Sequence, residues 1–228
     1  MDDLNKTTPQ DIAYAATKAA VGSVPIVGAA ASEILGLIVT APLEKRRNKL
    51  LTEIGERLKA LEEASRLDLG TLADNQLFLD TVLQATTYAL KTSEEEKISA
   101  FKNAIINTAL NQTPDETVSQ IFLNLLDNFT SWHIRILDLF NNPEEWFKTH
   151  NRTFPNYTSA GLSTVLGHAY PELKEQNELS NIIWGDLKRA GLHNSGDTLG
   201  GTMTASGLMS QRTTDMGRRF LRYIKESQ

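Results

Sequence analysis

The sequence predicts a mainly α-helical protein in two parts, with one short strand pair near the C-terminus. Apolar side chains recur at three- and four-residue steps, helix-capping residues open several segments, and Gly, Ser and Thr cluster between residues 192 and 214. The chain has 228 residues, of which 40% are hydrophobic and 22% charged, enough for one large domain or two small ones. We expect a helical bundle over 1–112 and a second domain over 113–228.

The composition excludes several classes of protein. The formal net charge of -5 gives no overall attraction to nucleic acid or anionic lipid, and a mean hydropathy of -0.29 argues against a multi-span membrane protein. Without cysteine, disulfides, thiolate metal sites and thiol nucleophiles are excluded. The acidic start MDDLNKTTPQ lacks the basic segment of a secretory signal. We therefore expect a cytoplasmic protein, with membrane association left open.

An apolar hairpin rich in Gly and Ala is predicted over about 9–41. Pro25 and the glycines around it predict a turn, because an interior Pro costs a helix about 3 kcal/mol and a Gly about 1 kcal/mol. A hairpin buried in a helical bundle is favoured, since each half is too short to span a membrane and Glu33 would have to enter hydrocarbon. The alternative is a hairpin that inserts residues 19–43 into a membrane. The candidate hairpin or membrane contacts are Pro25, Gly28, Glu33, Lys45, Arg46 and Arg47.

Amphipathic helices account for most of the next hundred residues. We expect them over about 43–63, 74–91, 93–110, 113–129 and 131–141. Ser93 with Glu96, and Thr113 with Glu116, have the spacing of a capping box and predict two of the helix starts. Over 43–63 basic residues precede acidic ones, against the preference of the helix dipole. This order leaves open a partner at the basic end, although a solvated face is favoured.

The last third of the chain is interrupted more often. Asn, Thr and Pro cluster over 142–158 and predict a boundary or a long connector. Helices are expected over 159–170 and 177–191, a hairpin of short strands within 192–214, and a final helix over 214–227.

Two motifs in this region resemble a winged helix-turn-helix. In DLKRAGL, Leu187, Gly191 and Leu192 match the Leu-x-x-x-Gly-Leu ending with which such domains leave their third helix for the wing. TTDMGRRFLRYI is similar to the Thr-x-x-Gly-x-x-Phe-Leu segment that follows the wing. The resemblance covers about half of the chain and implies a winged-helix-like domain over 113–228. Such domains bind DNA, bind proteins or dimerise.

The C-terminal ending is also similar to that of bacterial abortive-infection, phage-defence proteins of the "alpha" type. The segment SVPIVGAAASEILGLIVTAPLEKRR resembles one in uncharacterised bacterial helical proteins of that neighbourhood. These resemblances imply a role in bacterial conflict or regulation.

Basic residues gather toward the C-terminus. From Ser180 to Gln228 the chain carries seven basic and four acidic residues, so this end is about +3 while the whole chain is -5. A DNA-binding surface needs Lys or Arg for phosphates and Arg, Asn, Gln or Ser for base edges. The candidate nucleic-acid or partner contacts are Asn181, Lys188, Arg189, Arg212, Arg218, Arg219 and Arg222.

No catalytic motif is visible. The four histidines lack metal-ligand spacing, the Gly-rich segments lack a Walker lysine, and His133 is expected to be a packed or capping residue. We expect a non-enzymatic interaction or regulatory protein of bacterial defence type, acting through its winged-helix-like domain by protein contact or self-association. The alternatives are a DNA-binding transcriptional regulator and a membrane-acting effector. Neither a cofactor nor a small-molecule ligand is expected.

Overall fold

The computed structural model describes residues 41–112 and 114–226, so the predicted hairpin with Pro25, Gly28 and Glu33 lies outside the described residues. The chain divides into two compact units, Met1–Glu53 and Ile54–Gln228. The expected mainly helical class is confirmed: the described part holds ten α-helices, two single turns of 3₁₀ helix and one two-stranded antiparallel sheet. The 3₁₀ turns are Leu69–Thr71 and Pro171–Leu173. The other elements are α3 (Ala41–Glu63), α4 (Gln76–Ala89), α5 (Glu95–Ala109), α6 (Glu116–Asn128), α7 (Ser131–Asn141), α8 (Pro143–Thr149), β1 (Ser159–Gly161), α9 (Leu162–Ala169), α10 (Asn177–Arg189), β2 (Thr202–Thr204), α11 (Ala205–Met209) and α12 (Asp215–Ile224).

Helix α3 begins with the predicted basic cluster. Lys45, Arg46 and Arg47 are all exposed on this helix. Farther along, Lys59 and Glu63 form an exposed pair at 3.8 Å, an arrangement that stabilises a helix by about 0.3–0.5 kcal/mol. None of the described helices combines the length and apolar character needed to cross a bilayer.

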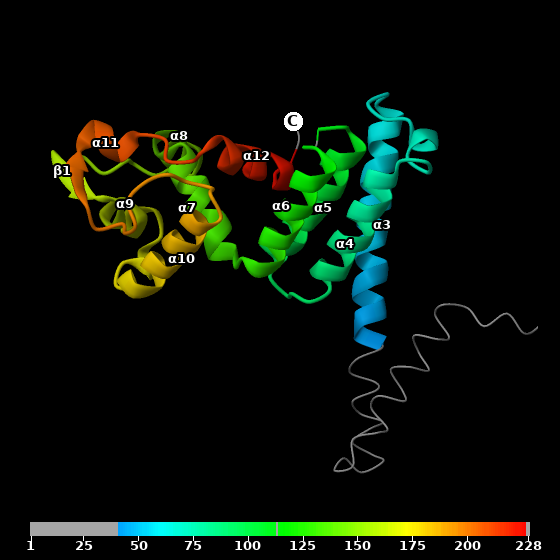
Figure 1. The fold of residues 1–228 in the computed structure, drawn as a ribbon, viewed down its shortest axis with the longest axis horizontal. Helices are drawn as coiled ribbons and strands as arrows, with labels where there is room; N and C mark the ends of the chain where they lie inside the picture. Colours follow the sequence, from blue (N-terminus) through cyan, green and yellow to red (C-terminus); the bar gives the residue numbers. More distant parts are fainter. Residues whose placement is uncertain (1–40, 113, 227–228) are drawn as a thin grey trace, which may run out of the picture. The chain divides into compact units, whose positions relative to one another are not determined.

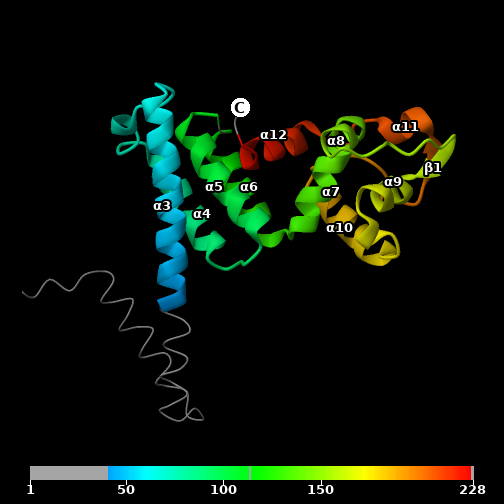
Figure 2. The ribbon, with the colours of Figure 1, turned by 180° about the vertical axis from the view of Figure 1, so that it is seen from behind.

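Helices α4, α5, α6 and α12 form a helical bundle within the unit Ile54–Gln228. Figures 1 and 2 show α4, α5 and α6 side by side, with α12 packed against α5. The rings of Phe122 and Phe220 meet edge to face at 5.4 Å, and Tyr223 lies 5.8 Å from Phe122. The Asn107 amide donates to the carbonyls of Arg222 and Tyr223 at the end of α12, where helical carbonyls lack intrahelical partners. The domain boundary predicted near residue 112 falls in the loop between α5 and α6, inside this bundle.

The remaining elements, α7 to α11 with the small sheet, pack around a second aromatic core. Trp184 of α10 is fully buried and meets Phe140 of α7 edge to face at 5.2 Å. Helix α8 occupies part of the segment expected to be a connector. The Asn142 side chain accepts from the Glu145 N–H, Pro143 takes the first helical position, and Trp146 is buried. Because a cap, a helix-starting Pro and apolar anchors coincide, this short helix is stable despite its loop-like composition.

Two predicted helix caps differ from those observed. Helix α5 starts at Glu95 after Glu94 rather than at a Ser93 capping box, and the Glu94 carboxylate accepts from the Ser131 N–H instead. Helix α6 starts at Glu116, where the Asp115 carboxylate accepts from the Val118 N–H at 3.2 Å. The predicted caps were therefore off by one residue for α5 and by two residues for α6.

The strand pair is not the hairpin expected within 192–214. β2 pairs antiparallel with β1, and Ala160 lies opposite Met203. Inside 192–214 the two arms meet only at a single bridge between His193 and Thr213. The partner of β2 is thus a strand far earlier in the chain, and α11 directly follows β2. The hairpin prediction was wrong because a local composition signal does not identify the partner of a strand.

The two C-terminal motifs have clear structural roles. Gly191 follows α10 with φ of 71°, and the Leu192 N–H donates to the Leu187 carbonyl at 3.0 Å, which is a Schellman ending. Thr214 caps α12 by accepting from the Gly217 N–H at 3.0 Å. A Cβ at Gly217 would overlap the Leu192 carbonyl. The motifs thus end α10, start α12 and hold these two points together.

Candidate functional site

The outer face of α10 exposes apolar side chains that a fully packed helix would bury. Leu179 and Ile182 are 41% and 55% exposed, while Ile183, Trp184 and Leu187 on the inner face are buried. Leu179 and Ile182 are three residues apart and therefore neighbours on the helix surface. The α10 outer face, which we define by Glu178, Leu179, Ile182, Gly185 and Arg189, combines this apolar pair with charges at its ends.

The predicted contact residues of α10 are already engaged inside the protein. Lys188 forms an ion pair with Asp197, and Arg189 pairs with Asp186. The Asn181 side chain accepts from the Leu199 N–H at 3.0 Å. A phosphate backbone would have to compete with these partners.

Acidic residues surround the N-terminal end of the same helix. Glu172, Glu175 and Glu178 are exposed there with Lys174 as the one cation among them. Within the described part of the chain, none of the three glutamates forms an ion pair. The local charge repels nucleic-acid phosphates and attracts cations.

The other predicted basic contacts lie on α12 and the loop before it, not on α10. Arg212 donates to the Gly207 carbonyl, and its burial lowers the pKa of the guanidinium. Arg218 pairs with Asp215 at 3.2 Å. Arg219 donates to the Met216 sulfur at 3.7 Å, and Arg222 is exposed. The structure therefore does not gather the seven predicted residues on one helix face.

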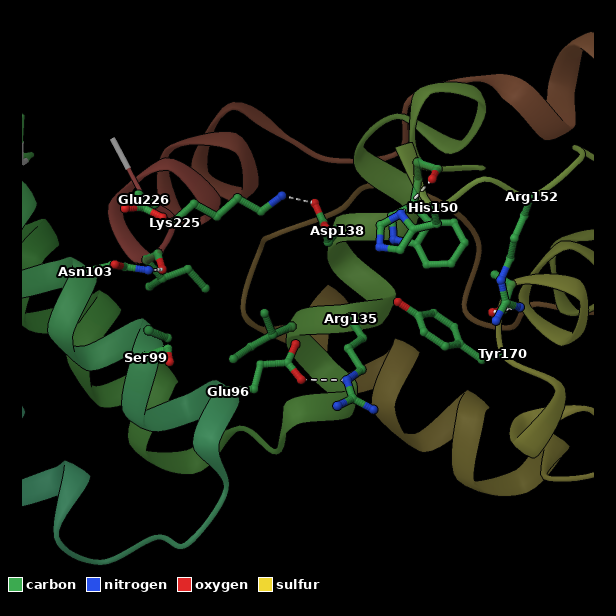
Figure 3. Close-up of a pocket in the computed structure, with 15 residues that line it drawn as sticks. Glu96, Ser99, Asn103, Arg135, Asp138, His150, Arg152, Tyr170, Lys225 and Glu226 are labelled. Atoms are coloured by element: carbon green, nitrogen blue, oxygen red, sulfur yellow. Dashed lines mark hydrogen bonds and ion pairs between the residues drawn. The ribbon is translucent and has the colours of Figure 1, made fainter. Parts of the chain in front are cut away.

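A pocket of about 480 Å³ lies where α5, α7, α8 and the end of α12 meet (Figure 3). Its charged side chains face one another in pairs. Arg135 donates to Glu96 at 2.6 Å, and Lys225 pairs with Asp138. Glu226 accepts from Arg57 at 2.9 Å. The first pair joins α7 to α5, and the second joins α7 to the residue that follows α12. The carboxylates and cations of these pairs are therefore bonded to each other across the pocket.

Aromatic rings and one arginine close the other side of this pocket. The His150 ring stacks on Trp146 and donates through Nδ1 to the Trp146 carbonyl at 2.7 Å. Burial raises the pKa of the Tyr170 phenol, which therefore stays protonated. Arg152 donates to the Ala169 carbonyl at 2.8 Å, at the end of α9. Sequence reasoning did not single out this pocket, because its residues come from separate elements and follow no common spacing.

A Thr–His–Asp arrangement near the pocket is a helix cap. The Thr130 N–H donates to His133 Nδ1 at 3.1 Å, and His133 Nε2 lies 3.3 Å from Asp186. Nδ1 is therefore an acceptor, and Nε2 carries the proton toward Asp186. The ring completes a capping box at the start of α7, and burial lowers its pKa. The expectation that His133 packs or caps is confirmed.

The other histidines contact main-chain carbonyls. His168 donates to Thr164 at 2.9 Å, and His193 donates to Trp184 at 2.8 Å while stacking on the Trp184 ring. Among the residues that the structure describes, no group of three His, Cys, Asp or Glu side chains is arranged to hold a metal ion.

Comparison with protein-family models, with curated proteins and with solved structures finds no match to this chain. Of the surfaces described above, the α10 outer face is the one that presents a pair of neighbouring exposed apolar side chains, Leu179 and Ile182.

Proposed function

We propose that this chain is a non-enzymatic interaction protein that binds a protein partner through the α10 outer face. The observation that carries the proposal is the exposure of Leu179 and Ile182 as neighbours on that face. The centres of protein interfaces are apolar and poor in charge, with polar residues at the rim. An apolar pair between Glu178 and Arg189 has this arrangement.

The order of the elements supports a winged-helix-like domain around this surface. Helix α7 is followed by the short helix α8, then by β1, α9 and α10, and then by a loop whose arms meet at His193 and Thr213. With α8 counted as an insertion between the first helix and β1, α10 takes the place of the third helix, which such domains present to their partners. The proposed role in bacterial defence depends on the sequence resemblance alone.

The charges around α10 favour a basic protein partner over DNA. Glu172, Glu175 and Glu178 are exposed at the N-terminal end of the helix that carries the apolar pair, so a partner with Lys or Arg flanking apolar side chains would be complementary. Lys188 and Arg189, the cations that would hold phosphates, are paired with acidic residues. An amphipathic basic helix is the partner that this chemistry fits best.

The test uses defined peptides and fluorescence anisotropy. One labelled peptide is an amphipathic helix of Leu and Lys, a second replaces Lys by Glu, and a third scrambles the first so that its charge is kept and its apolar face is lost. We expect the basic amphipathic peptide to bind, and the uncharged substitution Ile182→Asn to weaken that binding about tenfold or more. Leu83→Asn is the matched control, because Leu83 is 69% exposed on α4, away from α10.

Two results would contradict the proposal. Equal binding of the scrambled peptide would show that charge alone drives association, and an unchanged affinity of Ile182→Asn would exclude the α10 outer face. Retardation of duplex DNA at 50 mM salt, abolished by Arg218→Glu with Arg219→Glu, would favour the DNA-binding alternative instead.

A further inference from the structure

A second, smaller cavity lies on the opposite side of α10 from its outer face. It has a volume of about 170 Å³, which exceeds the roughly 30 Å³ that one water molecule occupies. Helix α9, the first turns of α10 and the loop before β2 surround it. Its walls are formed by Ser163, Leu166, Leu173, Asn177, Ser180, Asn181, Leu199 and Gly200.

The polar groups of this cavity are hydroxyls and amides, and none of the lining residues is charged. Ser180 is 2% exposed, and its hydroxyl has no hydrogen-bond partner in the described part of the chain. A buried hydroxyl without a partner is unfavourable, and such groups in native proteins usually bind a water or a ligand. The Ser180 hydroxyl is therefore available to form a hydrogen bond with a bound molecule.

The loop over the cavity is held in place on two sides. Leu199 donates its N–H to the Asn181 side chain at 3.0 Å and accepts from the Ser163 N–H at 2.9 Å. Its own side chain is buried. Asn181 uses its side-chain oxygen for this bond, so its NH₂ group remains a donor beside the cavity. The walls are therefore fixed by specific hydrogen bonds rather than by loose packing.

From this geometry we infer that the cavity binds a small uncharged molecule that carries a hydroxyl or amide group. Leu166, Leu173 and Leu199 provide the apolar wall, and the Ser and Asn side chains provide donors and acceptors. A charged ligand would lose its hydration without meeting an opposite charge on any lining side chain. This inference does not depend on the proposed function, because it concerns the inner side of α10.

The absence of cysteine from the chain gives a direct test. Ser180→Cys introduces a single thiol of similar shape into the cavity wall. Its reaction with methyl methanethiosulfonate in the folded protein is followed by mass spectrometry, with acetamide, ethylene glycol or acetate as competing probes. Thr86→Cys is the matched control, because the Thr86 hydroxyl is also buried without a described partner but does not line this cavity.

We expect the thiol at position 180 to react at least tenfold faster than the thiol at position 86. Acetamide and ethylene glycol should slow that reaction, and acetate at the same concentration should not. Equal rates at the two positions would show that no cavity reaches residue 180. Failure of both neutral probes to protect would mean that the cavity holds water only, and protection by acetate alone would assign it to anions; each of these results overturns the inference.

Discussion

Gly217→Ala should destabilise the fold, although replacing Gly by Ala normally stabilises a helix. An added Cβ at this position would overlap the carbonyl oxygen of Leu192, which already accepts from the Thr214 N–H at 2.9 Å. Relief requires α12 to move away from the end of α10. Because Phe220 and Tyr223 of α12 are buried in the bundle core, that movement also disturbs their packing.

The size of the effect follows from three contributions. Gly→Ala in a helix contributes about 1 kcal/mol of stabilisation. Loss of the hydrogen bond between Thr214 and Leu192 costs about 0.5–1.5 kcal/mol, and forced repacking costs about 1–3 kcal/mol. The free energy of unfolding should therefore fall by about 0.5–3.5 kcal/mol.

Urea unfolding followed by circular dichroism measures this change, provided that the m-value stays the same. Gly55→Ala is the control, because a Cβ at Gly55 meets nothing within 4 Å and the residue lies within α3. That variant should be more stable than the original chain by about 0.5–1 kcal/mol. If Gly217→Ala is equally stable or more stable, the close approach of α12 to Leu192 is not a feature of the folded protein.

Three further results are expected. Phe122→Ala should lower the free energy of unfolding by about 3–5 kcal/mol in urea titrations, because Phe122 is fully buried against α12. A loss below about 1 kcal/mol would contradict the burial of Phe122 in the bundle core. Lys225→Met should change the free energy of unfolding by less than about 1 kcal/mol, because the ion pair between Lys225 and Asp138 is partly exposed to solvent. A larger loss would show that this ion pair contributes substantially to stability. Stability should also fall as the pH drops below about 6.5, because burial lowers the folded-state pKa of both His133 and His193 and the unfolded chain therefore takes up these protons first. His133→Gln should make that part of the pH profile less steep, and an unchanged profile would exclude a contribution from His133.

The helices were predictable because their signals are local. Leu, Ile and Phe at three- and four-residue steps depend only on neighbours in sequence, and α4, α7, α10 and α12 lie close to the predicted ranges. Helix α8 was missed because Asn142 and Pro143 are as common in loops as at helix starts. Long-range pairing was not predictable, since the partner of β2 is β1 and the partner of Glu94 is Ser131.

The candidate sites depended even more on distant partners. Lys188 and Arg189 were predicted contacts on the basis of their charge, but Asp197 and Asp186 neutralise them in the fold. Ser180 had no signal in the sequence, because its significance comes from a cavity formed by three separated segments. The charges of the sequence thus predicted contacts on both α10 and α12, without showing which of those side chains remain available in the fold.

Protein binding by the α10 outer face is tested most directly by an NMR titration. The chain labelled with ¹⁵N is titrated with the basic amphipathic peptide, and shifts of the backbone amides are mapped onto the helices. We expect the largest shifts over residues 178–189, around the exposed Leu179 and Ile182, and little change over 216–224. Backbone shifts confined to the arginines of α12, or spread evenly over acidic residues elsewhere, would contradict binding at the α10 outer face.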